Sequence, residues 1–174
     1  MCLKRFFDEL RARNLEESSL VVIVGDHGFP MGEHGNYLNI SRAYPENLRT
    51  ICLFRWPRKL QERLLNHCGS QVDVGPTILH LLGIQAPSGF KGRSLLQEES
   101  EGNVALCTQP YDGGYVCAMH AGYSLVYSCQ SRAMLFRAWD DKYNPGGIPA
   151  PVKERLKFSL VRMAADLYQI EGSP

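Results

Sequence analysis

Two adjacent residues, Asp26 and His27, carry side chains that could bind a metal ion. They follow the apolar run Leu20–Val24, and a glycine on each side lets the backbone bend sharply and turn both side chains towards one cation. A carboxylate and an imidazole suit a divalent ion such as Ca²⁺, Mn²⁺ or Zn²⁺. A catalytic cation normally needs three or more protein ligands, so further ligands must come from elsewhere. The alternative to a metal site is a purely structural role for the pair, as a turn with a helix cap or a hydrogen-bonded histidine.

A buried β-strand is expected to position this pair. Leu20–Val24 is an unbroken apolar run, rich in β-branched residues and ended by Gly25, which is typical of a strand buried on both faces of a parallel sheet. In open α/β sheets, ligands bind at the carboxyl ends of such strands. A second run, Thr50–Trp56, ends at Pro57 and is predicted to be a neighbouring buried strand.

Helices are expected between and before these strands. Leu3–Arg13 has apolar residues at helical spacing, and Arg58–His67 has a weaker pattern of the same kind. A further helix is predicted over Val74–Leu82, with Asp73 as its N-cap and Gly83 just after its end.

A polar linker, Gln97–Asn103, predicts a boundary between residues 1–96 and 97–174. Beyond it, short strands separated by glycines and one long helix are expected, at Val104–Thr108, Tyr115–His120, Tyr123–Cys129 and Val152–Tyr168. The predicted fold class is therefore α/β: a partial sheet flanked by helices, followed by a small antiparallel sheet on which a C-terminal helix packs.

The composition excludes several classes of function. The 174 residues are 44% hydrophobic and carry 19 basic and 18 acidic side chains, so there is no electrostatic case for binding nucleic acid. No apolar run approaches the roughly 18 residues of a membrane span. The N-terminus lacks the apolar stretch and cleavage site of a signal peptide, and localisation is left open. The six cysteines form no CxxC pair, and Cys52 and Cys68 are expected to be buried free thiols.

Several segments, in the same order across residues 3–96, resemble the sulfatase family of the alkaline-phosphatase superfamily. Leu20–Gly35 contains Gly-Asp-His-Gly and then Gly-Glu-His-Gly, as the family does after a buried strand. The other similar segments are Phe6–Asn14, Tyr44–Thr50, Ser70–Ile84 and Gly89–Leu96. The resemblance implies a partial alkaline-phosphatase-like sheet in residues 1–96 and a variable C-terminal subdomain after it.

The resemblance also implies roles for single residues. Asp26 and His27 correspond to ligands of a divalent metal, which stabilises a nucleophile and screens the charge of a sulfate or phosphate ester. His34 corresponds to a residue near the pocket and is a candidate catalytic residue, or else a histidine that braces the loop. Family members are often lysosomal, secreted or membrane-associated.

Two departures from the family pattern limit the assignment. Sulfatases usually have a lysine that holds a sulfate oxygen where this sequence has Asn39, with Arg42 nearby as a substitute. Both are candidate substrate-binding residues, but an amide binds an anion less strongly, so a phosphoethanolamine or phosphoglycerol transferase, or a phosphodiesterase relative, is the alternative.

The second departure is that the sequence contains no Cys-x-Pro-Ser-Arg nucleophile motif. We expect the missing N-terminal half, with the nucleophile and an acidic pair, to be required for a complete site, and these 174 residues to be inactive alone. The remaining alternative is a non-catalytic, truncated module. The sequence upstream of Met1 would distinguish the sulfatase, the phosphoester relative and the non-catalytic module.

Overall fold

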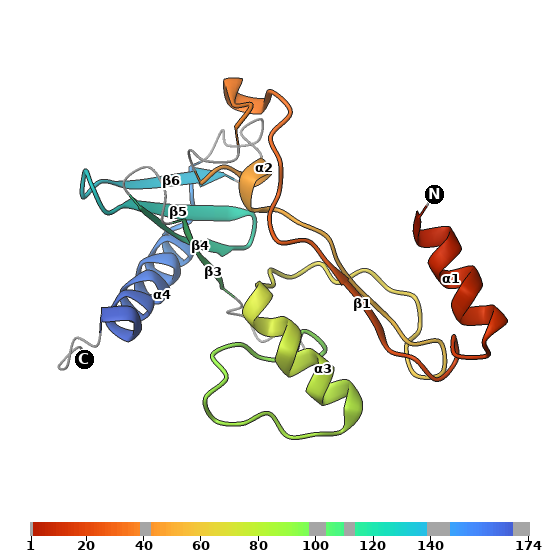
Figure 1. Cartoon of the computed structure of the whole chain (residues 1–174). Helices are drawn as coiled ribbons and strands as arrows, with labels where there is room; N and C mark the ends of the chain where they lie inside the picture. The colour runs from red at the N-terminus through yellow and green to blue at the C-terminus, as the bar shows by residue number, and fades with distance from the viewer. Residues whose placement is uncertain (1, 39–42, 98–103, 110–113, 139–146, 169–174) are drawn as a thin grey trace. The chain divides into compact units, whose positions relative to one another are not determined.

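The chain is mixed α/β, with small antiparallel sheets and a C-terminal helix. The computed structural model describes residues 2–38, 43–97, 104–109, 114–138 and 147–168 (Figure 1). The helices are α1 (Cys2–Ala12), α2 (Pro45–Leu48), α3 (Val74–Leu82) and α4 (Ala150–Tyr168), with short 3-10 turns at Glu33–Gly35 and Gln71–Asp73. The strands are β1 (Val21–Val24), β2 (Cys52–Arg55), β3 (Ala105–Gln109), β4 (Tyr115–His120), β5 (Tyr123–Ser128) and β6 (Met134–Ala138).

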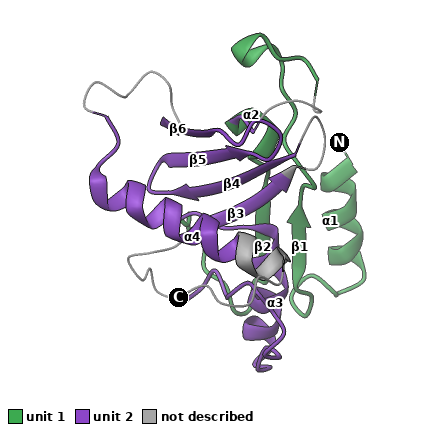
Figure 2. Ribbon diagram, turned by 90° about the vertical axis from the view of Figure 1, so that its left-hand side faces the viewer, with its two compact units in different colours: residues 1–39, 45–65 green, residues 40–44, 66–174 purple. Residues whose placement is uncertain are grey.

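The chain divides into two compact units, coloured separately in Figure 2. Unit 1 comprises residues 1–39 and 45–65, and unit 2 comprises residues 40–44 and 66–174. The boundary between residues 1–96 and 97–174 that the polar linker indicates stays a prediction. Within the described part of the chain, no helix is long and apolar enough to span a membrane.

Unit 1 contains a two-stranded sheet of β1 and β2. The strands are neighbours, as predicted, but they run antiparallel, with Val21 opposite Arg55 and Val24 opposite Cys52. The prediction of a parallel sheet with both faces buried is wrong, since β1 is half-buried and Val24 is 44% exposed. An unbroken apolar run specifies a strand, but the strand's direction depends on how the chain returns, and its burial depends on what covers it.

Helix α1 confirms the predicted N-terminal helix. Its last turn is joined to the sheet through Glu16, which accepts hydrogen bonds from Arg11 and, at 2.6 Å, from Arg55. The guanidinium of Arg55 also lies 5.3 Å from the centre of the Phe7 ring. Leu3 and Phe6 are 55% and 46% exposed, so the apolar side of α1 is covered only in part.

The helix predicted for Arg58–His67 is absent. The chain makes a single turn there, in which the amides of Lys59 and Leu60 donate to the carbonyl of Trp56. A short helix is stable mainly when an apolar face packs on another element. Leu64 is 85% exposed, so the apolar side chains of this segment are covered only in part by the described residues.

Helix α3 begins and ends where predicted, but its start is built differently. Asp73 stands at the N-cap position without a capping bond to α3, and its carboxylate instead accepts from the amides of Ser70 and Arg93 at 2.8 and 2.9 Å. Ser70 and Asp73 form a capping box around the preceding 3-10 turn. Gly83 ends α3 with φ 76°, the left-handed conformation that glycine adopts readily.

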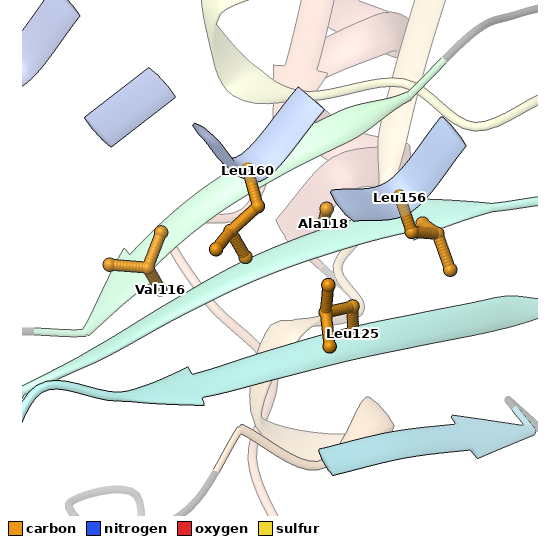
Figure 3. Close-up of a cluster of buried hydrophobic side chains, with 5 residues drawn as sticks. All are labelled: Val116, Ala118, Leu125, Leu156 and Leu160. Carbon is orange, nitrogen blue, oxygen red and sulfur yellow. The ribbon is translucent and has the colours of Figure 1, made fainter. Parts of the chain in front are cut away.

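The core of unit 2 lies between α4 and the four-stranded antiparallel sheet β3-β4-β5-β6. Figure 3 shows Leu156 and Leu160 of α4 directed at Val116 and Ala118 of β4 and Leu125 of β5. This confirms the predicted antiparallel sheet and C-terminal helix. Strand β6 was not predicted, because its sequence lacks the alternation of a half-buried strand.

Candidate metal centre

Asp26 and His27 lie directly after β1 and bring their side chains together. The Oδ2 atom of Asp26 is 3.5 Å from Nε2 of His27. The other carboxylate oxygen, Oδ1, accepts a hydrogen bond from the His27 amide at 3.0 Å, which fixes the turn. The Asp26 side chain is 87% exposed and that of His27 is 48% exposed, so both are open to solvent.

A hydrogen bond to the backbone sets the protonation of the His27 ring. Its Nδ1 lies 2.7 Å from the carbonyl oxygen of Gly28. A carbonyl only accepts, so Nδ1 carries the proton and Nε2 of the neutral ring carries a lone pair. Histidines that bind metals are commonly held in this way, with the other nitrogen donating to a carbonyl. The atom that faces Asp26 is therefore the one suited to a cation.

The donor pair fits one divalent cation in part. Two ligands at about 2.1–2.3 Å from a metal in tetrahedral or octahedral geometry lie roughly 3.0–3.7 Å apart, which includes the observed separation. No group of three or more His, Cys, Asp or Glu residues that could hold a metal occurs within the described ranges. Asp26 and His27 are therefore two candidate donors, and tight binding of a cation would need further ligands.

The loop after His27 is packed against α2. The amide of Gly28 donates to the carbonyl of Asn47 at 3.0 Å. A side chain at Gly28 would overlap the carbonyl oxygens of Glu46 and Arg49, so this contact requires glycine. Close backbone packing of this kind fixes where the two ligand candidates stand at the end of β1.

A buried asparagine pair holds the far end of the same loop. Asn36 is 7% exposed and Asn47 is 3% exposed, and the Asn36 side-chain amide donates to Oδ1 of Asn47 at 3.1 Å. Oδ1 of Asn36 accepts from the amide of Leu38 at 3.2 Å. The loop from His27 to Leu38 is therefore anchored to α2 at both ends.

His34 is held by α2 as well. Its Nδ1 lies 3.0 Å from Oε1 of Glu46, whose side chain is only 11% exposed. His34 has φ 53°, an uncommon left-handed conformation for a residue with a side chain. Next to it, the amide of Met31 donates to the Glu33 carboxylate at 2.5 Å and lowers the pKa of Glu33. These contacts agree with the loop-bracing alternative for His34 and leave its catalytic role a prediction.

The two candidate substrate-binding residues are not described by the structure. Asn39 and Arg42 fall outside the described residues. Asn36, Glu46 and Asn47, which support the site, were not predicted from the sequence. Their signal is weak, because polar residues in a loop and a one-turn helix are ordinary, and only the fold shows that two of them are buried.

Comparisons with known proteins agree with the resemblance. The family model described as sulfatase matches residues 1–84. The chain is 30% identical over 95 residues to a Caenorhabditis elegans homolog of the extracellular sulfatase Sulf-1, covering 55% of this chain and 13% of that protein. It is also 30% identical over 112 residues to lipoteichoic acid synthase 1 of Bacillus subtilis, covering 59% of this chain and 17% of that one.

A solved structure shows the same fold. The protein BT4656, in complex with its substrate D-glucosamine-2-N,6-O-disulfate, superposes with a TM-score of 0.70 at 18% identity, covering 97% of this chain. This chain spans 38% of that structure and less than a fifth of the two curated relatives. The described elements therefore correspond to part of a larger domain in these proteins.

Proposed function

We propose that this chain supplies part of the divalent-metal centre of a sulfuric ester hydrolase. The premise is that residues 1–84 belong to the sulfatase family of the alkaline-phosphatase-like superfamily and match part of larger sulfatase chains. Asp26 and His27 are the proposed metal ligands. The observation that carries the proposal is the 3.5 Å separation between Asp26 Oδ2 and His27 Nε2, together with the contact of His27 Nδ1 with the Gly28 carbonyl, which would leave the Nε2 lone pair of the neutral ring available to a cation. When bound, the cation would supply positive charge close to the ester oxygens.

The residues around the pair keep it in this arrangement. Asp26 would neutralise part of the cation's charge, and the Gly28 carbonyl would keep His27 in the tautomer that donates through Nε2. The anchoring of Gly28 to α2 fixes the position of the loop. Because Glu46 holds Nδ1 of His34, any contact of His34 with the substrate would be made by Nε2.

The proposed substrates are sulfate esters, with Asn39 and Arg42 as candidates for binding the substrate anion. A second function has a specific observation in its favour. Asn39 stands where a sulfatase usually has a lysine, and lipoteichoic acid synthase 1 is among the proteins that the chain resembles. A phosphoester transferase or hydrolase is therefore the alternative, and the missing nucleophile must be supplied in either case.

A loop graft tests the proposal, since these 174 residues alone are not expected to turn over either ester. Residues 20–49 would replace the matching segment of BT4656, and turnover of the disulfated glucosamine would be measured with the divalent metal present. We expect metal-dependent turnover that falls more than about 100-fold on Asp26→Asn, because even the supporting partners of metal ligands are worth about 10–100-fold. The matched control is Glu33→Gln, which keeps an acceptor for the Met31 amide.

A folded, active graft in which Asp26→Asn has no more effect than Glu33→Gln would contradict the assignment. The same graft separates the two functions. Under the sulfatase proposal, Asn39→Lys increases turnover of the sulfate ester, because it restores the lysine that sulfatases usually carry here and an ammonium binds an anion more strongly than an amide does. Unchanged turnover of the sulfate ester, with faster turnover of a matched phosphate ester, would favour the phosphoester alternative.

A further inference from the structure

Two cysteines stand directly opposite each other in the sheet of unit 2. In the pairing of β3 with β4, Cys107 faces Cys117. Both thiols are free. Cys117 is only 1% exposed, whereas Cys107 is partly exposed on β3, the outermost strand at one side of the sheet. Cys107 is thus the more accessible cysteine of the pair and Cys117 the protected one.

The pair lies on the sheet face that is turned away from α4. Successive side chains of a strand point to opposite faces. Leu106 and Ala118, the next register pair, belong to the cluster that packs against Leu156 and Leu160 of α4. Cys107 and Cys117 therefore point to the other face, where they lie side by side.

The spacing of this pair suits a disulfide. Directly opposed residues of antiparallel strands have Cα atoms about 4.5 or 5.5 Å apart. A disulfide needs Cα atoms about 4.4–6.8 Å apart. The Cα spacing of the pair therefore falls within the range that a disulfide needs.

We infer that Cys107 and Cys117 are a site of reversible disulfide formation, which ties the outer strand β3 covalently to β4. No role in the proposed ester hydrolysis involves either residue, so the inference is independent of that function. The chemical class of the oxidant is a low-molecular-weight disulfide, which reaches the partly exposed Cys107 first.

The difference in exposure assigns the order of reaction, since Cys107 is partly exposed and Cys117 is buried. Hydrogen bonding with Cys117 lowers the pKa of Cys107, whereas hydrogen bonding with Cys107 and burial raise the pKa of Cys117. Since the thiolate is the nucleophile, Cys107 is the attacking residue and Cys117 is the resolving residue.

The exchange balances in two steps. The Cys107 thiolate attacks one sulfur of the oxidant, the oxidant's S–S bond breaks, and one thiolate leaves and takes up a proton. The Cys117 sulfur then loses its proton and attacks the Cys107 sulfur, which forms the protein disulfide and releases the second thiol. The protein loses two electrons and two protons, and the oxidant is reduced to two thiols.

The test is a titration of the chain with oxidised glutathione, followed by blocking of free thiols and peptide mapping with chymotrypsin, which can cleave after Tyr115 between the two cysteines. We expect a cross-linked pair of peptides containing Cys107 and Cys117, and an increase in Tm of roughly 5–10 °C that dithiothreitol reverses. Cys107→Ser should lose both signals. Cys52→Ser, at an exposed cysteine opposite Val24, should keep both.

The wild-type map tests the inference even if a variant folds poorly. The inference would be overturned if Cys107 and Cys117 remained free to alkylation while the exposed cysteines became glutathionylated. It would also be overturned if another cysteine pair formed in preference, or if Cys107→Ser showed the same reversible change in Tm.

Discussion

The side chains of Asn36 and Asn47 hold the loop that follows Asp26 and His27 against α2. Both are buried, and the bond between them is 3.1 Å long. A buried amide that loses its partner costs more free energy than the bond itself contributes, because it has given up its hydration. At the scale of single residues, the position of the metal-ligand candidates thus depends on neighbours that bind no metal.

We predict that Asn47→Ala lowers the free energy of unfolding by about 1–3 kcal/mol, since it leaves the Asn36 amide without this acceptor. Urea unfolding of Asn36→Ala, Asn47→Ala and the double variant gives a double-mutant cycle. The expected coupling between the two residues is about 0.5–3 kcal/mol. Additive losses in the double variant would show that the asparagine pair does not stabilise the loop.

Part of the candidate site could be predicted from the sequence. Asp26 and His27 are adjacent, follow an apolar run and are flanked by glycines, so local geometry alone indicated that their side chains share one side of a turn. The supports Glu46 and Asn47 could not be predicted in the same way. They reach the loop only because the chain folds back through α2, and nothing in their own spacing reports this contact.

Helix α4 is the element whose packing the sequence predicts best, because its apolar residues recur at helical spacing. Leu156 is fully buried against the sheet, whereas Phe158 is 62% exposed. Leu156→Ala should lower the free energy of unfolding by about 2–5 kcal/mol through lost burial and a cavity. The matched control, Phe158→Ala, should cost less than about 1 kcal/mol. Equal losses in urea unfolding would mean that α4 is not seated on β4 and β5 as described.

The elements that the sequence misjudged share a physical cause. The run over Leu20–Val24 indicates a strand correctly, but burial and direction depend on partners outside the run. Likewise, the predicted helix over Arg58–His67 is absent, and among the described residues its apolar side chains are covered only in part, with Leu64 85% exposed. Cys52 was expected to be buried and is exposed, as is its neighbour Leu53 at 39%.

At the scale of the whole molecule, the chain is a partial match to larger proteins. It spans 38% of the solved structure that it superposes on, and residues 1–84 match the sulfatase family model. Apolar side chains of unit 1 are open to solvent, including Val24, Ile51 and Leu53, with exposures of 44%, 59% and 39%. The proposed metal centre is incomplete in the described residues, so its ligands are best tested by binding rather than by turnover.

The most direct test is a titration of the chain with Mn²⁺, followed through the ring signals of its five histidines by NMR. The unpaired electrons of Mn²⁺ broaden the signals of nearby nuclei, so a bound ion reports its own position. We predict that the His27 signals broaden at the lowest metal concentration, before those of His80 and His120. Asp26→Asn should shift this broadening to at least about tenfold higher Mn²⁺, and Glu33→Gln should not. Equal broadening of all exposed histidines, or an Asp26→Asn variant that behaves as wild type, would contradict the claim that Asp26 and His27 bind one cation.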